Sequence, residues 1–214
     1  LTRGLQQEPM FTALAGPVAT LLSLDADGNR TEVAVPAAVN ALPLACDVAA
    51  PGGTMWCVLE GAGVGRRNGE NDWRIIFQEV PALAGGDGRD LAVAADDQVY
   101  VATDRGVVFL SGNSLRTFNR AGTGGGLPGD DVRAVALGGD GRLYAATDAG
   151  IGIYNAETME WETLGADVLP SVDVLSVAVA PDNSVWAGTS AGLLKINPDR
   201  TTETYGVGDG LPSA

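Results

Sequence analysis

The chain has 214 residues and a formal net charge of −14, from 27 acidic against 13 basic residues, and it contains no histidine. A nucleic-acid-binding protein needs a basic face, and no basic cluster extends beyond Arg66-Arg67, so the charge excludes that class of partner and disfavours anionic membranes. The missing histidine excludes active sites that depend on it within this chain, and 30 Gly with 11 Pro favour short strands over helices.

The first segment, residues 1–36, predicts a partial unit of strands. "MFTAL" and "ATLLSL" have the composition of strands, and "DADGN" has that of the hairpin turn that follows. Asp25, Asp27 and Asn29 in this turn resemble the start of a calcium loop, but Pro36 stands where such a loop has glutamate. We keep calcium here as an alternative to a plain turn, and we expect no other cofactor or metal.

The second unit, residues 37–82, carries both cysteines of the chain. Cys46 and Cys57 lie on its first two strands, and the hairpin "AAPGG" between them brings them opposite or diagonal to each other. The pair therefore predicts either a disulfide or two small buried thiols. "GAGVG" (residues 61–65) lacks the third glycine and the helix of a dinucleotide fingerprint, so we interpret it as a turn between strands.

Three regular units follow, over residues 83–126, 127–168 and 169–210. The clearest predicts strands over 132–137, 142–147, 151–155 and 160–164, separated by the turns "GGDG", "DAG" and "AETM". The aromatic residue near the start of the second strand recurs at steps of 44, 44 and 42 residues (Trp56, Tyr100, Tyr144 and Trp186).

A repeat of this length with four strands is typical of a β-propeller blade, because each small sheet needs a neighbour on both faces. The predicted fold is therefore all-β, with four-stranded antiparallel blades, about four of them complete and one partial. Residues 211–214 begin a further repeat, since Leu211-Pro212 repeats Leu169-Pro170. We consider a closed five-bladed ring and a piece of a larger ring, and favour the second; the rest of a longer parent chain or complex is then a partner.

The pattern "GLP-x-D-V-x-A-V-A", followed by "D-G-x-L-Y-x-A-T-D-x-G-I-x-x-Y", is carried by residues 126–154 and less fully by residues 169–196. It resembles the propeller repeats of two-component regulator sensor domains. The resemblance covers residues 83–214, implies the propeller fold and an extracytoplasmic location (periplasmic, cell-surface or secreted), and does not name a ligand.

Strand direction predicts which loops share a face of the disc. Turns between second and third strands, and connectors between units, fall on one side, which we call the loop face. Loops on a rigid scaffold are the usual place for binding. The residues we select there as a ligand-binding face are Asp104, Arg105, Asp130, Asp131, Asp148 and Ser190, and Asp87, Asp90 and Asp173 lie on the same side. This mostly acidic face favours a cation, a polyamine or a basic protein surface.

We therefore predict a non-catalytic binding or protein-interaction propeller with a protein partner or small ligand on its loop face. No run approaches the ~20 apolar residues that span a bilayer, so the chain is not itself expected to cross a membrane. One alternative is an enzyme that works with a carboxylate pair, such as a lyase or a glycan-cleaving protein, although no pair is singled out. Another is a structural subunit, which an exposed apolar patch near Trp161 or Tyr205 would favour.

Overall fold

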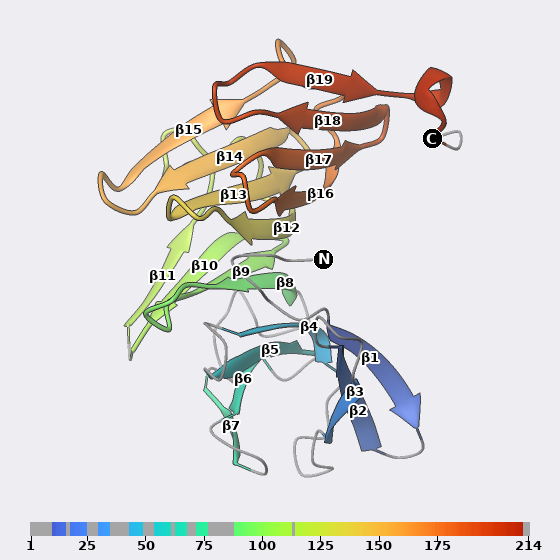
Figure 1. The fold of residues 1–214 in the computed structure, drawn as a ribbon. Coiled ribbons are helices and arrows are strands. Elements are labelled where there is room, and N and C mark those ends of the chain that lie inside the picture. Colours follow the sequence, from blue (N-terminus) through green and yellow to red (C-terminus); the bar gives the residue numbers. More distant parts are fainter. Residues whose placement is uncertain are drawn as a thin grey trace.

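A computed structural model describes residues 10–15, 18–24, 30–34, 43–48, 54–60, 63–67, 72–76, 88–112 and 114–211, the first three ranges as backbone only. Nearly all of these residues are in strands or tight turns (Figure 1). The strands of the N-terminal part are β1 (Met10–Ala15), β2 (Val18–Leu24), β3 (Arg30–Ala34), β4 (Pro43–Val48), β5 (Met55–Leu59), β6 (Gly63–Arg67) and β7 (Trp73–Ile75).

The remaining strands follow in three groups of four, and a 3₁₀ turn (Val207–Asp209) comes after the last of them. Within the described residues no helix is long and apolar enough to cross a membrane. The strands are β8 (Gly88–Val93), β9 (Val99–Thr103), β10 (Gly106–Ser111), β11 (Ser114–Phe118), β12 (Val132–Leu137), β13 (Arg142–Thr147), β14 (Gly150–Asn155), β15 (Glu160–Leu164), β16 (Val174–Val179), β17 (Val185–Thr189), β18 (Gly192–Ile196) and β19 (Thr202–Tyr205).

Consecutive strands pair with each other and build separate sheets. Four antiparallel sheets have four strands each, in the orders β4-β5-β6-β7, β8-β9-β10-β11, β12-β13-β14-β15 and β16-β17-β18-β19, and β1-β2-β3 forms a three-stranded sheet. The predicted all-β class with four-stranded antiparallel units is confirmed. Every connection within a sheet is a hairpin, which is why short turns with Asp, Asn and Gly recur along the chain.

The first strand of each four-stranded sheet lies on the inside of the arrangement. β4 packs beside β8, β8 beside β12, and β12 beside β16. Figure 1 shows the sheets fanned out from these inner strands, with β7, β11, β15 and β19 at the outer edges. The sheets therefore stand side by side around a common centre, as the repeat predicted.

The core lies between neighbouring sheets, because a sheet that has a neighbour on each side is apolar on both faces. In β13, Leu143 and Ala145 pack toward the β8–β11 sheet, whereas Tyr144 and Ala146 pack toward the β16–β19 sheet. A strand buried on both faces shows no alternation of polar and apolar residues, and all but the first residue of β13 are buried. Small residues on the inner strands let the sheets approach closely near the centre.

The interpretation of "GAGVG" as a turn is wrong for its last three residues, because Gly63–Arg67 forms β6, to which Arg66-Arg67 also belongs. Residues 61 and 62 lie outside the described residues. Gly65 sits where a side chain does not fit: an added Cβ would lie 2.7 Å from Leu59 Cδ1 and 3.6 Å from Trp73 Cε3. The glycine is therefore a close-packing position within a strand rather than a turn former.

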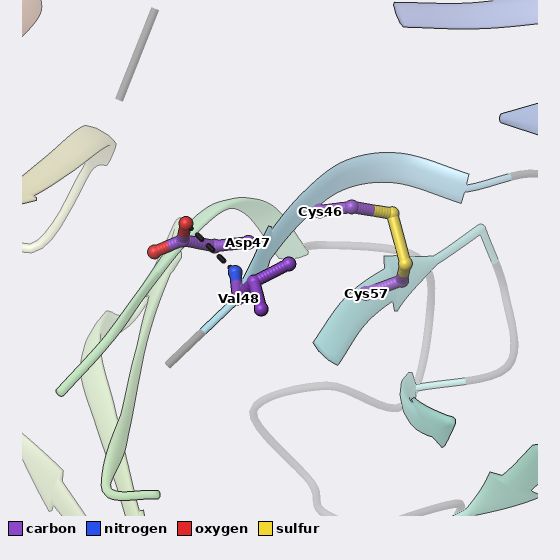
Figure 2. The surroundings of a disulfide bond; sticks show 4 residues. All are labelled: Cys46, Asp47, Val48 and Cys57. Atoms are coloured by element: carbon purple, nitrogen blue, oxygen red, sulfur yellow. Dashed lines mark hydrogen bonds between the residues drawn. A yellow bond between two sulfur atoms is a disulfide. The ribbon is translucent and has the colours of Figure 1, made fainter. Parts of the chain in front are cut away.

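The two cysteines are joined. Cys46 on β4 and Cys57 on β5 stand directly opposite each other in the strand register and form a disulfide with an S–S distance of 2.02 Å (Figure 2). Cys57 is fully buried. Of the two outcomes that the sequence left open, the structure has the disulfide, which crosslinks the inner strand of this sheet to its neighbour.

Candidate functional site

Strand register brings the turns and connectors of the loop face together. Val132 at the start of β12 pairs with Thr147 at the end of β13, so the connector before β12 lies beside the turn after β13. The same holds for Val174 and Thr189 in the next sheet. The selected residues thus lie at one end of the sheets, in the turns after β9, β13 and β17 and in the connectors before β12 and β16.

A repeated hydrogen bond shapes the turns. The Oγ1 of Thr147 donates to the carbonyl of Gly150 at 2.8 Å and accepts from the amide of Ala149 at 3.1 Å. Thr103 and Thr189 make the same pair of bonds in their own sheets. Each turn is therefore fixed by a buried or nearly buried hydroxyl, which holds the residue after the threonine in the same position on every sheet.

The residues after these threonines differ in their surroundings. Asp104 is half-buried, and its Oδ1 lies 3.9 Å from the Nε of Arg105. Asp148 is exposed, and its carboxylate lies against Gly129. Ser190 instead shares a hydrogen bond of 2.9 Å with the hydroxyl of Ser171. The acidic character of the turns therefore ends before the last sheet.

A row of alternating charges crosses three inner strands at this end. The guanidinium of Arg89 pairs with the Oδ1 of Asp131, whose Oδ2 lies 3.5 Å from the Nε of Arg133. Arg133 also donates to the Oδ1 of Asp173 at 2.6 Å. The hydrogen bond to Asp173 is the main cause that raises the pKa of Arg133. We call these four residues the rim ladder; they bind three neighbouring sheets to one another.

Two further aspartates bridge inner strands in a different way. Asp47 accepts from the amide of its own neighbour Val48 (Figure 2). It also accepts from the amide of Val93 on β8 at 2.9 Å. Asp90 on β8 accepts from the amide of Val135 on β12 at 3.0 Å. An inner strand pairs with another strand on one side only, so the amides on its other side have no partner in their own sheet. These carboxylates supply one. Asp90 is thus a clamp between sheets rather than an open ligand on the loop face.

Asp90 gives a prediction with a defined pH dependence. Asp90→Ala leaves the Val135 amide without an acceptor, and we expect a loss of about 2 kcal/mol in the free energy of unfolding. Burial raises the pKa of Asp90 above its ordinary 3.8, so the folded protein binds this proton more readily than the unfolded chain. The contribution of native Asp90 to stability is therefore largest at low pH. The loss in the free energy of unfolding on Asp90→Ala should grow as the pH falls from 7 toward 3.8.

The measurement is urea unfolding of both proteins at several pH values. Glu160→Ala serves as the control, because Glu160 is exposed at the start of β15, and this variant should show a small loss that does not depend on pH. A loss for Asp90→Ala that shrinks as the pH is lowered would contradict the assignment of a raised pKa.

Four of the other predicted positions lie outside the described residues. They are Asp25, Asp27 and Asn29, the calcium candidates, and Asp87. Within the described part of the chain, no group of three or more Cys, Asp or Glu side chains is arranged to hold a metal ion. Asp130 is exposed, and its Oδ1 accepts from the Arg120 amide at 2.6 Å.

Sequence reasoning missed the arginines of the rim ladder. The selected residues do not include Arg89 and Arg133, although these stand 44 positions apart in equivalent places of two repeats. Asp131 and Asp173 repeat at a step of 42 directly before the inner strands. Charges of opposite sign that recur in phase with the blades were a signal for ion pairs between blades.

Comparison with known proteins addresses the fold. No model of a known protein family matches the chain, and no curated protein matches it in sequence. Virginiamycin B lyase from Staphylococcus aureus matches in structure, with a TM-score of 0.65 and 13% identity over 91% of this chain and 64% of the lyase. The fold is a β-propeller. The chain spans less than two thirds of that lyase, and at such identity the likeness shows the fold alone.

Two other solved structures with this fold have different roles in their descriptions. One is the extracellular domain of BT3049 from B. thetaiotaomicron, described as a hybrid two-component system; it has a TM-score of 0.65 and 16% identity, and the match covers all of this chain and 30% of that one. The other is YCF48 bound to D1 peptide, with a TM-score of 0.60 and 16% identity over 94% of this chain and 67% of YCF48. One propeller fold thus serves enzymes, sensors and peptide binding.

Proposed function

We propose that this chain is a non-catalytic binding propeller that holds a protein partner on its loop face. The observation that carries the proposal is the rim ladder, which ties three sheets together at the end where Asp130 and Asp148 remain exposed. A surface fixed in this way presents charges in set positions at little entropic cost on binding. The two exposed carboxylates favour a partner with lysine or arginine side chains.

The similar structures support this proposal in two ways. YCF48, with the same fold, is described as bound to a peptide, and BT3049 contributes the extracellular domain of a two-component system. A lyase of this fold is described as catalytically inactive when one histidine is replaced by alanine, and this chain contains no histidine. Binding therefore fits the side chains present better than chemistry of that lyase type.

The location we propose is extracytoplasmic. Disulfides persist in oxidising compartments, and this chain joins Cys46 to Cys57. The repeat type we propose is that of two-component regulator propellers, in agreement with the extracellular-domain neighbours. In such an arrangement the loop face would meet the partner outside the cell membrane.

The test compares two double variants that remove equal charge from opposite ends of one sheet. Asp130→Asn with Asp148→Asn removes the two exposed carboxylates on which the proposal rests but keeps side chains of the same shape. Glu157→Gln with Glu160→Gln removes two exposed charges from the hairpin between β14 and β15, at the other end. The probe is a deca-lysine peptide, and calorimetry at low and physiological salt measures its affinity.

We expect the loop-face variant to weaken binding roughly tenfold, because two exposed ion pairs contribute about 0.7 kcal/mol each. The hairpin variant should leave the affinity nearly unchanged. Equal weakening by both variants would mean that the peptide responds only to the net charge of −14, and the proposed face would then be wrong.

A further inference from the structure

A groove lies at the outer edge of the fan, where the β8–β11 and β12–β15 sheets meet. Arg116 and Phe118 on β11 line it together with Met159 and Trp161 of the next sheet. Figure 1 shows β11 and β15 as the outermost strands of these two sheets. The groove has a volume of about 650 Å³, within the range of roughly 300–1,000 Å³ that is typical of small-molecule sites. We call it the outer groove.

Aromatic rings form the apolar part of the outer groove. The ring centroids of Phe118 and Trp161 lie 5.4 Å apart in an edge-to-face arrangement, and the ring of Tyr154 lies 5.0 Å from each of them. Phe118 and Tyr154 are buried, whereas Trp161 is half-buried. The Trp161 ring lies directly over Gly152, where an added Cβ would be 3.0 Å from its Cζ3. The rings therefore give the groove an apolar surface in a fixed position.

The repeat shows what is missing from the outer groove. Arg116 on β11 and Glu162 on β15 hold the same register position in neighbouring sheets. Met159 and Arg200 are the residues with positive φ in the hairpins that lead into β15 and β19. Glu162 and Arg200 are joined across their sheets by two hydrogen bonds of 2.8 and 3.0 Å. Arg116 and Met159 cannot form such a pair, so the arginine lacks the counter-ion that closes the next outer edge.

Two hydrogen-bond donors in the groove have no acceptor within the described part of the chain. The exposed guanidinium of Arg116 lies 4.7 Å from the ring centroid of Phe118, and no described carboxylate forms an ion pair with it. The Nε1 of Trp161 is shielded from solvent and has no hydrogen-bond partner there either. A buried indole N–H usually has an acceptor. Both groups favour a ligand with oxygen acceptors, and the guanidinium favours an anionic one.

The acidic residues that also line the groove do not oppose an anion beside Arg116. Glu160 and Glu162 alternate with Trp161 along β15, so their side chains belong to the opposite face of that strand. Glu162 is also neutralised by its ion pair with Arg200. An anion next to Arg116 and Trp161 therefore lies on the face of β15 that turns away from both glutamates.

We infer that the outer groove binds an organic carboxylate that carries a bulky apolar group. The carboxylate pairs with Arg116, and an oxygen of the ligand supplies the acceptor that Trp161 lacks. The apolar group packs on the Trp161 ring and on Met159, which is 67% exposed and whose unbranched side chain adapts to the shape of a ligand. This inference does not depend on the function proposed for the loop face, because the rim ladder lies at the inner strands.

The test titrates the full chain with N-acetylphenylalanine and follows the indole N–H signals by nuclear magnetic resonance, with Trp161 assigned by its loss in Trp161→Phe. The neutral amide of the same compound is the comparison. We expect a saturable shift of the Trp161 signal with the acid and about fivefold weaker binding of the amide, the effect of one exposed ion pair. Arg116→Gln should lower the affinity for the acid to that for the amide. Arg74→Gln, which removes the same charge from β7, should leave it unchanged.

A second pair of variants tests where the carboxylate binds. Met159→Glu supplies a carboxylate from the hairpin and recreates, with the charges exchanged, the ion pair of the next outer edge. We expect it to weaken binding of the acid about fivefold, whereas Met159→Gln, of the same length without the charge, should keep the affinity within about twofold. The inference is overturned if the Trp161 signal shows no saturable shift, if acid and amide bind equally, or if Arg116→Gln and Arg74→Gln weaken binding to the same extent.

Discussion

Replacing Gly150 by alanine is expected to reduce the free energy of unfolding by about 3 kcal/mol. Gly150 has a φ of +129°, in a region that side chains rarely adopt. A Cβ built there would lie 2.5 Å from the carbonyl oxygen of Leu164, which is backbone and has little freedom to move. The variant must therefore shift β14 or β15 as well as accept the strained φ. Urea unfolding measures the loss.

Gly141 provides the matched control. It also has a positive φ, +77°, but a Cβ there meets nothing within 4 Å. Asp97 and Asn183 hold the equivalent hairpin position in the neighbouring repeats with φ values of 66° and 62°. Gly141→Asn should therefore change the free energy of unfolding by less than about 0.5 kcal/mol. Similar losses for the two glycine variants would show that the turn after β13 is not a special position.

Local turn signals explain why the fold could be predicted from the sequence. Strand bounds of 132–137, 142–147 and 160–164 were predicted and are those of β12, β13 and β15. Hairpin turns are fixed by residues within a few positions of one another, so their glycines and aspartates are visible locally. The repeat then multiplies each local signal, because the same turn occurs in every unit.

Contacts between sheets were not predictable in the same way. Asp97 lies in the turn between β8 and β9. Its carboxylate also accepts from the indole of Trp56 at 3.1 Å and from Arg66 at 3.0 Å, both in the preceding sheet. Asn183 likewise accepts from the Gly139 amide of the preceding sheet at 2.9 Å. Partners more than 30 positions apart leave no mark in local composition, so these second roles came only with the structure.

That the selected turns and connectors share one end of the sheets could be predicted, but the charges around them could not. Alternation of strand direction was enough to assign the turns and connectors to one end, and the register of β12 with β13 places them there. Counting charges suggested a mostly acidic face. Arg89 and Arg133 change that, because their side chains extend from strands into the same end and pair with Asp131 and Asp173. A face composed from loop residues alone omits what neighbouring strands contribute.

Removal of the disulfide is expected to cost about as much as the Gly150 substitution. Cys46 and Cys57 are separated by 11 positions, and in the chain-entropy account closing a loop of this size stabilises the folded state by about 3 kcal/mol. A double variant, Cys46→Ala with Cys57→Ala, should lose this amount and a small packing term for the buried Cys57 side chain.

Reduction of the native chain separates the crosslink from the packing. Dithiothreitol should lower its urea midpoint nearly to that of the double variant and should leave the variant unchanged. Loss of stability on reduction would tie folding to an oxidising compartment, as the proposed extracytoplasmic location requires. If the native chain has the same urea midpoint with and without reductant, while mass spectrometry shows both thiols free, the disulfide does not hold β4 to β5 and no longer supports that location.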